Sequence, residues 1–208
     1  MAYTDFKTLA QVEKELEVNI KQASKLYIDI KPIELSTWFK ETMDLSYDLA
    51  ININTEAARQ SLIVDNVLIE LKKLVPISLF IKRYFNVDAS KGLTGNPDGL
   101  VCSYLDDLEI KAPVIVLVEA KNNDINPGFP QCIAEMVAAA LFNKKASIVR
   151  ETVYGVVTDG ISWRFVNLKD NQATIDKHTY PFNGGSQIIA ILKSFILDNE
   201  GINGVRLN

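Results

Sequence analysis

Apolar residues recur at helical spacing through the first quarter of the chain. Residues 5–28 show this spacing, which predicts an amphipathic helix or a pair of helices. The Lys31-Pro32 step predicts a break, because proline disfavours helical backbone in the residue before it. Residues 34–48 are predicted to form a further helix. We interpret this whole region as packing or interaction elements and assign no chemistry to it.

The clearest helical pattern in the chain covers residues 55–74. Its apolar stripe consists of Ile63, Val67, Leu71 and Leu74. Extending the stripe backwards reaches Gln60 and then Glu56, so Glu56 is expected to face the core, whereas Glu70 is expected on the polar side. Glu56 then has two interpretations. It either contacts the helix dipole or an arginine, or it reaches a polar site at the edge of a sheet.

From residue 77 onward, alternating patterns and short apolar runs predict strands. The predicted strands cover residues 77–85, 99–105, 114–118, 152–159, 161–168 and 172–182. The unbroken run Val114 to Val118 is typical of a strand buried on both faces in the middle of a sheet. An alanine-rich helix is predicted at residues 131–142, and a closing helix at residues 185–199. The single histidine, His178, is interpreted as an ordinary edge-strand residue.

The composition narrows the class of protein to which the chain can belong. A chain of 208 residues with 48% hydrophobic and 23% charged residues suits one globular domain with an added helical lobe. The formal net charge of −4 gives no global basic field, so any binding of a polyanion needs a local patch. Cys102 and Cys132 are too few for a secreted disulfide framework, which favours a reducing cytoplasm. No apolar run has the length of a membrane span, so no membrane association is expected.

Candidate chemistry gathers around the end of the buried run. Glu119 and Lys121 follow it directly and share one face of the strand. A carboxylate and an ammonium at such a place are costly unless they are paired or have a function. Asp98 lies in Asn-Pro-Asp-Gly, which by itself is typical only of a turn. Gln131 opens the following helix and is either an exposed first-turn residue or a hydrogen-bond partner of Glu119.

Together these motifs resemble a known family. Pro97-Asp98, followed 21 positions after Asp98 by Glu119-Ala120-Lys121, resembles the signature of the PD-(D/E)XK nuclease superfamily. The segment TEAARQSLIVDNVLIEL resembles the first core helix of restriction-type nuclease domains, and the segment YGVVTDGISWRF recurs among such proteins.

The resemblance implies an α/β fold with a restriction endonuclease-like αβββαβ core, in which a central mixed sheet is flanked by helices. Residues 1–50 would then form an N-terminal helical extension. Residues 51–208 would form the nuclease-like domain, ending in a C-terminal hairpin and a helix, and the two parts would make one compact unit.

The resemblance also implies a Mg²⁺- or Mn²⁺-dependent endodeoxyribonuclease. Asp98 and Glu119 would supply hard carboxylate oxygens to the metal, with the Ala120 carbonyl completing the shell and Glu56 reaching a second ion directly or through water. A metal between these ligands and a phosphate lowers the pKa of a bound water. Lys121 would orient that water or stabilise developing charge, and Gln131 would join the same catalytic set.

DNA is the expected partner, with no membrane, and a homodimer or partner proteins of a restriction or repair system are compatible with this assignment. An acidic chain is a poor match for a general DNA binder. A second hypothesis therefore keeps the nuclease fold without catalysis, as a module that binds nucleic acid or protein. A third hypothesis is an unrelated α/β protein in which Glu119 and Lys121 form a buried structural pair.

Overall fold

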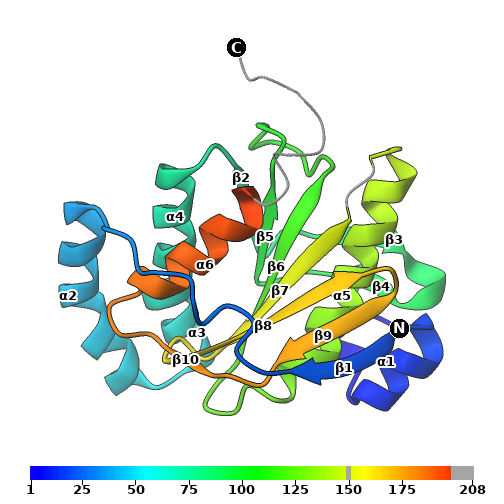
Figure 1. Ribbon diagram of the computed structural model, residues 1–208, viewed down its shortest axis with the longest axis horizontal. Helices are drawn as coiled ribbons and strands as arrows, with labels where there is room; N and C mark the ends of the chain where they lie inside the picture. Colours follow the sequence, from blue (N-terminus) through cyan, green and yellow to red (C-terminus); the bar gives the residue numbers. More distant parts are fainter. Residues whose placement is uncertain (149–150, 198–208) are drawn as a thin grey trace.

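A mixed β-sheet runs through the middle of the protein, with helices on both of its faces (Figure 1). The computed structural model describes residues 1–148 and 151–197. Within these residues the sheet has eight strands, in the order β1-β9-β8-β7-β6-β5-β2, and β10 pairs with β8. The predicted α/β class, with a central mixed sheet flanked by helices, is therefore confirmed.

The strands of this sheet are β1 (Asn19–Ala23), β2 (Ser78–Ile81), β5 (Gly99–Cys102), β6 (Val114–Ala120), β7 (Thr152–Thr158), β8 (Ser162–Lys169), β9 (Gln172–Asp176) and β10 (Tyr180–Pro181). A separate two-stranded sheet consists of β3 (Phe85–Asp88) and β4 (Leu93–Gly95). The helices are α1 (Leu9–Leu16), α2 (Thr37–Ile53), α3 (Glu56–Arg59), α4 (Asp65–Leu74), α5 (Gly128–Lys145) and α6 (Ser186–Leu197). Short helical turns are η1 (Tyr3–Asp5), η2 (Gln60–Val64) and η3 (Ala89–Lys91).

Strand β6 occupies the centre that its sequence predicts. It pairs parallel with β7 on one side and antiparallel with β5 on the other, and all seven of its residues are buried. Because side chains alternate along the strand, Val116 and Val118 pack into the core beneath α2, α4 and α6. Leu117 packs into the second core, beneath α1 and α5. None of the described helices is long and apolar enough to cross a membrane.

The predicted helix at residues 55–74 is one helical segment with a π-helical turn inside it. Thr55 caps its start by accepting a hydrogen bond from the Ala58 N–H at 3.2 Å. The turn η2 closes with a hydrogen bond from the Asp65 N–H to the Gln60 carbonyl, five residues earlier. The predicted apolar stripe is confirmed for Ile63, Val67 and Leu71, which are fully buried, whereas Leu74 at its end is only partly buried.

Glu70 on this helix contradicts its predicted exposed position. It is 0% exposed, and its carboxylate accepts hydrogen bonds from the Ser36 N–H and the Ser36 hydroxyl, both at 2.7 Å. Ser36 caps the start of α2, so Glu70 ties two helices together. The spacing of apolar residues indicates one buried face of a helix, and it contains no information about a second helix that covers the adjoining face.

The predicted helical region at residues 5–28 is correct only for α1. Residue Glu17 adopts a left-handed conformation with φ of 55° and ends that helix. Residues Asn19–Ala23 then form β1, which pairs parallel with β9 at the edge of the sheet. Backbone hydrogen bonds to a distant strand override the local helical pattern here. Residues 1–50 thus contribute a strand to the main sheet as well as helices.

Smaller differences concern the limits of the remaining elements. The predicted strand at residues 77–85 is divided into β2 and the start of β3, and the β3–β4 hairpin was not predicted. His178 lies between β9 and β10 rather than in an edge strand, and its N–H donates to Asp176 Oδ1 at 2.9 Å. The closing helix α6 is confirmed as far as Leu197, and residues 198 and 199 of that prediction lie outside the described residues.

Removing the carboxylate of Glu70 should destabilise the fold. We expect Glu70→Ala to lower the free energy of unfolding by about 2 to 3 kcal/mol, because two hydrogen bonds to a buried charged group are lost. Urea unfolding followed by circular dichroism measures the change. Glu41→Ala, at an exposed position on α2, should change it by no more than about 0.5 kcal/mol. Equal values for the two variants would contradict the role of Glu70.

Candidate functional site

Glu119 and Lys121 lie where β6 leaves the sheet, next to the first turns of α5. The Glu119 side chain is 1% exposed, and both of its carboxylate oxygens are engaged. Oε1 pairs with the Lys121 ammonium, and Oε2 accepts a hydrogen bond from Gln131 Nε2 at 2.7 Å. Gln131 therefore contacts Glu119, as one of its two interpretations requires, and is not a freely exposed first-turn residue.

A glycine allows α5 to approach this end of β6 closely. Gly128 is the first residue of α5, and a Cβ atom there would lie 2.5 Å from Val157 Cγ1. It would also lie 3.2 Å from Lys121 Cγ and 3.4 Å from Glu119 Cγ. Glycine at this position thus allows the helix start to pack directly against the two charged residues.

Asp98 reaches the same place from the neighbouring strand. It immediately precedes β5, whose Gly99 is paired with Val118 of β6. Asp98 Oδ2 accepts a hydrogen bond from the Ala120 N–H at 2.8 Å, and Oδ1 lies 3.3 Å from Lys82 Nζ. The turn residue Asp98 is therefore a direct neighbour of the Glu119-Ala120-Lys121 segment.

Glu56 faces the site from the first turn of α3 without touching it. The side chain is half-buried, and its charge contributes to raising the pKa values of Glu119 and Lys121. Its carboxylate forms no hydrogen bond or ion pair with another described residue. Among the described residues, no group of three or more histidine, cysteine, aspartate or glutamate side chains is close enough to hold a metal ion. Asp98 lies next to the Glu119-Ala120 segment through its hydrogen bond with the Ala120 N–H, whereas Glu56 makes no direct contact with either carboxylate.

The electrostatics of the site reflect two carboxylates in a dry environment. Burial, and then the charge of Asp98, raise the pKa of Glu119 to about 8, although Lys121 partly offsets both effects. Burial alone lowers the pKa of Lys121, but the charges of Glu119, Glu56 and Asp98 outweigh it, so this pKa lies above its ordinary value. Lys121 is therefore a charged ammonium, and Glu119 gains or loses its proton near pH 8.

The chemistry of these donors suits a hard divalent cation. Two carboxylates and nearby backbone oxygens are the ligands that Mg²⁺ and Mn²⁺ prefer, and Mg²⁺ commonly uses only one or two carboxylates plus water. A cation between Asp98 and Glu119 would relieve the repulsion that raises the pKa of Glu119. Asp98 and Glu119 are thus ligands of a kind that fits such an ion.

Sequence reasoning missed two acidic residues beside the site. Glu135, one turn after Gln131 on α5, is 0% exposed, and its Oε1 accepts from Gln131 Nε2 at 3.1 Å. Burial and the charge of Glu119 raise its pKa well above the ordinary value. Its four-residue spacing from Gln131 was a visible signal. Asp65, which directly follows the π-helical turn, has its pKa raised to about 6 by burial and then by the charge of Asp98, and no sequence pattern indicated this proximity.

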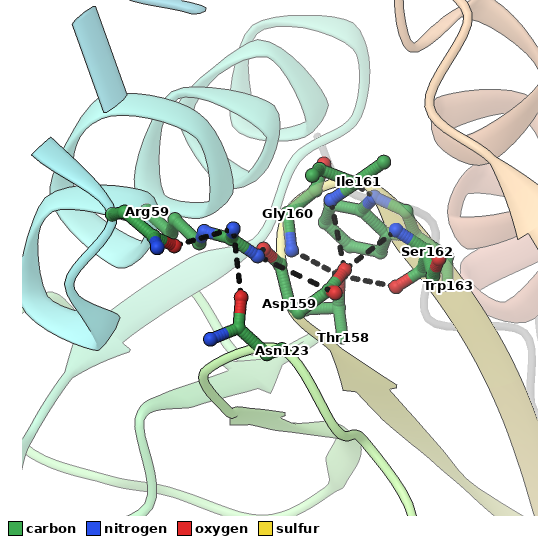
Figure 2. A network of polar contacts seen from close by, with 9 residues as sticks. Arg59, Asn123, Thr158, Asp159, Gly160, Ile161, Ser162 and Trp163 are labelled. Carbon is green, nitrogen blue, oxygen red and sulfur yellow. Dashed lines mark hydrogen bonds and ion pairs between the residues drawn. The ribbon is translucent and has the colours of Figure 1, made fainter. Parts of the chain in front are cut away.

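Arg59 fixes the surroundings of the site (Figure 2). Its buried guanidinium extends from α3 to the turn between β7 and β8, where Nη1 donates to the Asp159 carbonyl at 3.2 Å and lies 3.4 Å from Asp159 Oδ2. Nη2 donates to Asn123 Oδ1 at 3.1 Å, in the loop that follows Lys121, and to Asn54 Oδ1 at 2.8 Å. The helix that carries Glu56, the end of β6 and the β7–β8 turn are thereby held together.

The turn that receives Arg59 has its own hydrogen bonds (Figure 2). Asp159 Oδ1 accepts from the Ile161 and Ser162 N–H groups at 3.0 and 2.7 Å, so the carboxylate both closes the turn and meets the guanidinium. The hairpin predicted from Asp159-Gly160 is confirmed, since β7 and β8 pair antiparallel around it.

Comparison with known proteins adds no further assignment, because no known family matches the sequence and no curated protein matches it significantly.

Stability in the absence of metal should depend on pH through Glu119. The folded-state pKa of about 8 lies above the ordinary value of 4.5, so the folded protein binds this proton more tightly than the unfolded chain. Its contribution to stability is fully present below about pH 4.5 and is lost as the pH rises through about 8. With EDTA present, the urea midpoint of the wild type should fall relative to that of Glu119→Gln between about pH 5 and about pH 9. Parallel midpoints across this range would contradict the assignment.

The buried pair of Arg59 and Asp159 should be costly to break. We expect Arg59→Leu to lower the free energy of unfolding by about 3 to 5 kcal/mol, because Asp159 is left as a buried charge without its partner. Urea unfolding measures the loss. The control is Lys40→Ala, which removes the exposed ion pair with Glu34 and should cost less than about 1 kcal/mol. Similar losses in the two variants would show that the buried pair contributes no more to the free energy of unfolding than an exposed pair does.

Proposed function

We propose that this protein is a metal-dependent nuclease that hydrolyses DNA phosphodiester bonds, of the restriction or repair type, with a PD-(D/E)XK site. The observation that carries the proposal is the hydrogen bond from the Ala120 N–H to Asp98 Oδ2. Through it, an aspartate that follows a proline lies beside the glutamate and lysine of a Glu-Ala-Lys segment. A structural salt bridge between Glu119 and Lys121 needs no second carboxylate at that place, and the charge of Asp98 adds repulsion toward Glu119.

The order of elements supports the finer fold assignment, a restriction endonuclease-like core. A helical segment from Glu56 to Leu74 precedes β2, β5 and β6, and α5 then leads to β7. This is the αβββαβ order, with β5 antiparallel and β7 parallel to the central β6. The β3–β4 hairpin is inserted between β2 and β5, away from the main sheet.

In the proposed mechanism, Asp98, Glu119 and the Ala120 carbonyl would hold Mg²⁺ or Mn²⁺, and Glu56 would join through water or by a side-chain movement. The ion would polarise the phosphate and lower the pKa of a bound water. Lys121, charged and only 21% exposed, would orient the attacking water and stabilise negative charge that develops on the phosphate. Gln131 holds Glu119 Oε2 in place by its hydrogen bond.

A catalytically silent module that keeps the nuclease fold is the second candidate. It is favoured by the net charge of −4, which opposes polyanion binding, and by the engagement of the Asp98 and Glu119 carboxylates with groups of the chain itself. Metal binding separates the two candidates, because catalysis requires a divalent ion and a silent scaffold has no need of one.

Metal binding should depend on Asp98. We expect calorimetric titration with Mn²⁺ to detect binding to the wild type and to Asp44→Asn, an exposed acidic residue of α2. Binding should be lost, or weakened about tenfold or more, in Asp98→Asn, which keeps the shape but not the charge. Silence of the wild type would favour the module, and equal binding by all three proteins would place the ion elsewhere.

Cleavage should require Lys121. With Mg²⁺ or Mn²⁺ the wild type should cleave plasmid or single-stranded DNA, and Lys121→Ala should reduce the rate at least about 100-fold, because the charge beside the reacting phosphate is lost. Lys40→Ala, on the outer face of α2, should cleave like the wild type. Absence of cleavage by the wild type with either metal, across salt and pH, would refute the proposed activity.

A further inference from the structure

The structure contains a buried carboxyl group with one oxygen left unpaired. Glu135 lies inside α5 with no exposed surface, and its Oε2 has no hydrogen-bond partner among the described residues. A buried polar atom without a partner is unfavourable. Asn143, a second buried polar residue of α5, shows the ordinary alternative, because it accepts from the Val114 N–H at 2.7 Å and donates to the Val114 carbonyl at 2.8 Å.

Glu135 is the last member of a continuous hydrogen-bonded line that begins at the proposed active site. The line runs from the Lys121 ammonium to Glu119, from Glu119 to Gln131 Nε2, and from Gln131 Nε2 to Glu135 Oε1. The Gln131 amide nitrogen therefore donates to both carboxyl groups, at 2.7 Å to Glu119 and at 3.1 Å to Glu135.

This shared nitrogen determines which end of the Gln131 amide faces Glu119. An amide group has donors on its nitrogen and only acceptors on its oxygen, so a half-turn would direct the oxygen at two carboxyl groups. Glu119 alone gives one reason for the observed orientation, and Glu135 gives a second reason on the other side of the same nitrogen. With both in place, the side chain of Gln131 is restricted to the orientation in which it donates to Glu119.

The N-terminal segment covers the inner side of this arrangement. Tyr3 is buried against the α5 layer, and its hydroxyl donates to the Phe85 carbonyl at 3.0 Å. Burial, and then the charge of Glu135, raise the pKa of Tyr3 above its ordinary value, so the two side chains lie within electrostatic reach. Gly95 makes room for the ring, since a Cβ there would lie 2.8 Å from Tyr3 Cδ2. Figure 1 shows the N-terminus beside β4, on the side of α5.

We propose that Glu135 is a positioning residue for the metal site, which acts by holding the Gln131 amide and, through it, the Glu119 carboxylate. The inference rests on the proposed function and adds to it a residue that contacts neither metal nor substrate. The unpaired Glu135 Oε2 lowers the stability of the fold, and Glu119 is restrained in return. Such an exchange is expected where a functional site is kept at the expense of stability.

The decisive variant is Glu135→Met, which keeps much of the volume and removes both oxygens. We expect its melting temperature without metal to equal or exceed that of the wild type, because a buried unpaired polar atom is gone. Its Mn²⁺ affinity by calorimetry and its rate of DNA cleavage should both fall by about tenfold or more, as for other residues that orient a metal ligand. Glu135→Gln, which retains an oxygen to accept from Gln131, should restore both to within about threefold of the wild type.

Variants at Gln131 show whether the effect passes through this residue. If Glu135 acts only by holding that amide, the double variant Gln131→Leu with Glu135→Met should match Gln131→Leu alone in Mn²⁺ affinity and rate. Asn143→Leu is the control for a buried polar residue of the same helix. It should lower the melting temperature and leave Mn²⁺ affinity unchanged.

The outcomes separate this inference from the proposed function. A wild type that binds Mn²⁺ and cleaves DNA, together with a Glu135→Met variant that does both equally well, overturns the role of Glu135 and leaves the nuclease assignment standing. The role is also overturned if Glu135→Met destabilises the fold as Asn143→Leu does, or if the effects of Gln131→Leu and Glu135→Met are additive. A wild type that neither binds Mn²⁺ nor cleaves overturns both.

Discussion

The contact between the Asp98 carboxylate and the Ala120 N–H is the constraint on which the candidate site depends. It joins the residue before β5 to the end of β6, and it exists only because the two strands pair antiparallel with Gly99 opposite Val118. A register shifted by one residue would turn the side chains of β5 to the opposite face of the sheet. The site is thus a product of strand register, and the apolar residues of β6 that fix the register also fix the chemistry.

Around that contact the protein concentrates buried polar groups that are unfavourable for folding. Glu119, Glu135 and Asp65 all have pKa values raised by burial, and the charges of Asp98 and Glu119 add to the effect. Arg59 compensates nearby, because its buried guanidinium neutralises Asp159 and ties three segments of backbone together. A rigid frame beside an electrostatically strained cluster is compatible with the cation site that we propose.

Elements with strong local signals were predictable from sequence, and elements created by tertiary contacts were not. The buried strand β6, the helix α5 and the β7–β8 hairpin follow from an apolar run, an alanine-rich helix and a turn dipeptide. The proximity of Gln131 to Glu119 followed from the position of the next helix, and that of Asp98 followed from the resemblance to the PD-(D/E)XK signature. Strand β1, the buried position of Glu70 and the π-helical turn beside Asp98 depend instead on partners far away in the chain.

The pairing of β1 with β9 has a consequence for how the chain folds. Asp176, at the end of β9, accepts hydrogen bonds from the Lys25 and Leu26 N–H groups, which lie 151 and 150 positions earlier in the chain. During synthesis β1 has no partner until the chain has been made as far as β9. Such long-range closure slows folding and leaves a strand with unpaired backbone groups in the meantime. Charged residues within β1 and just after it, Lys21 and Lys25, are of the kind that protects an exposed strand from pairing with other chains while it waits.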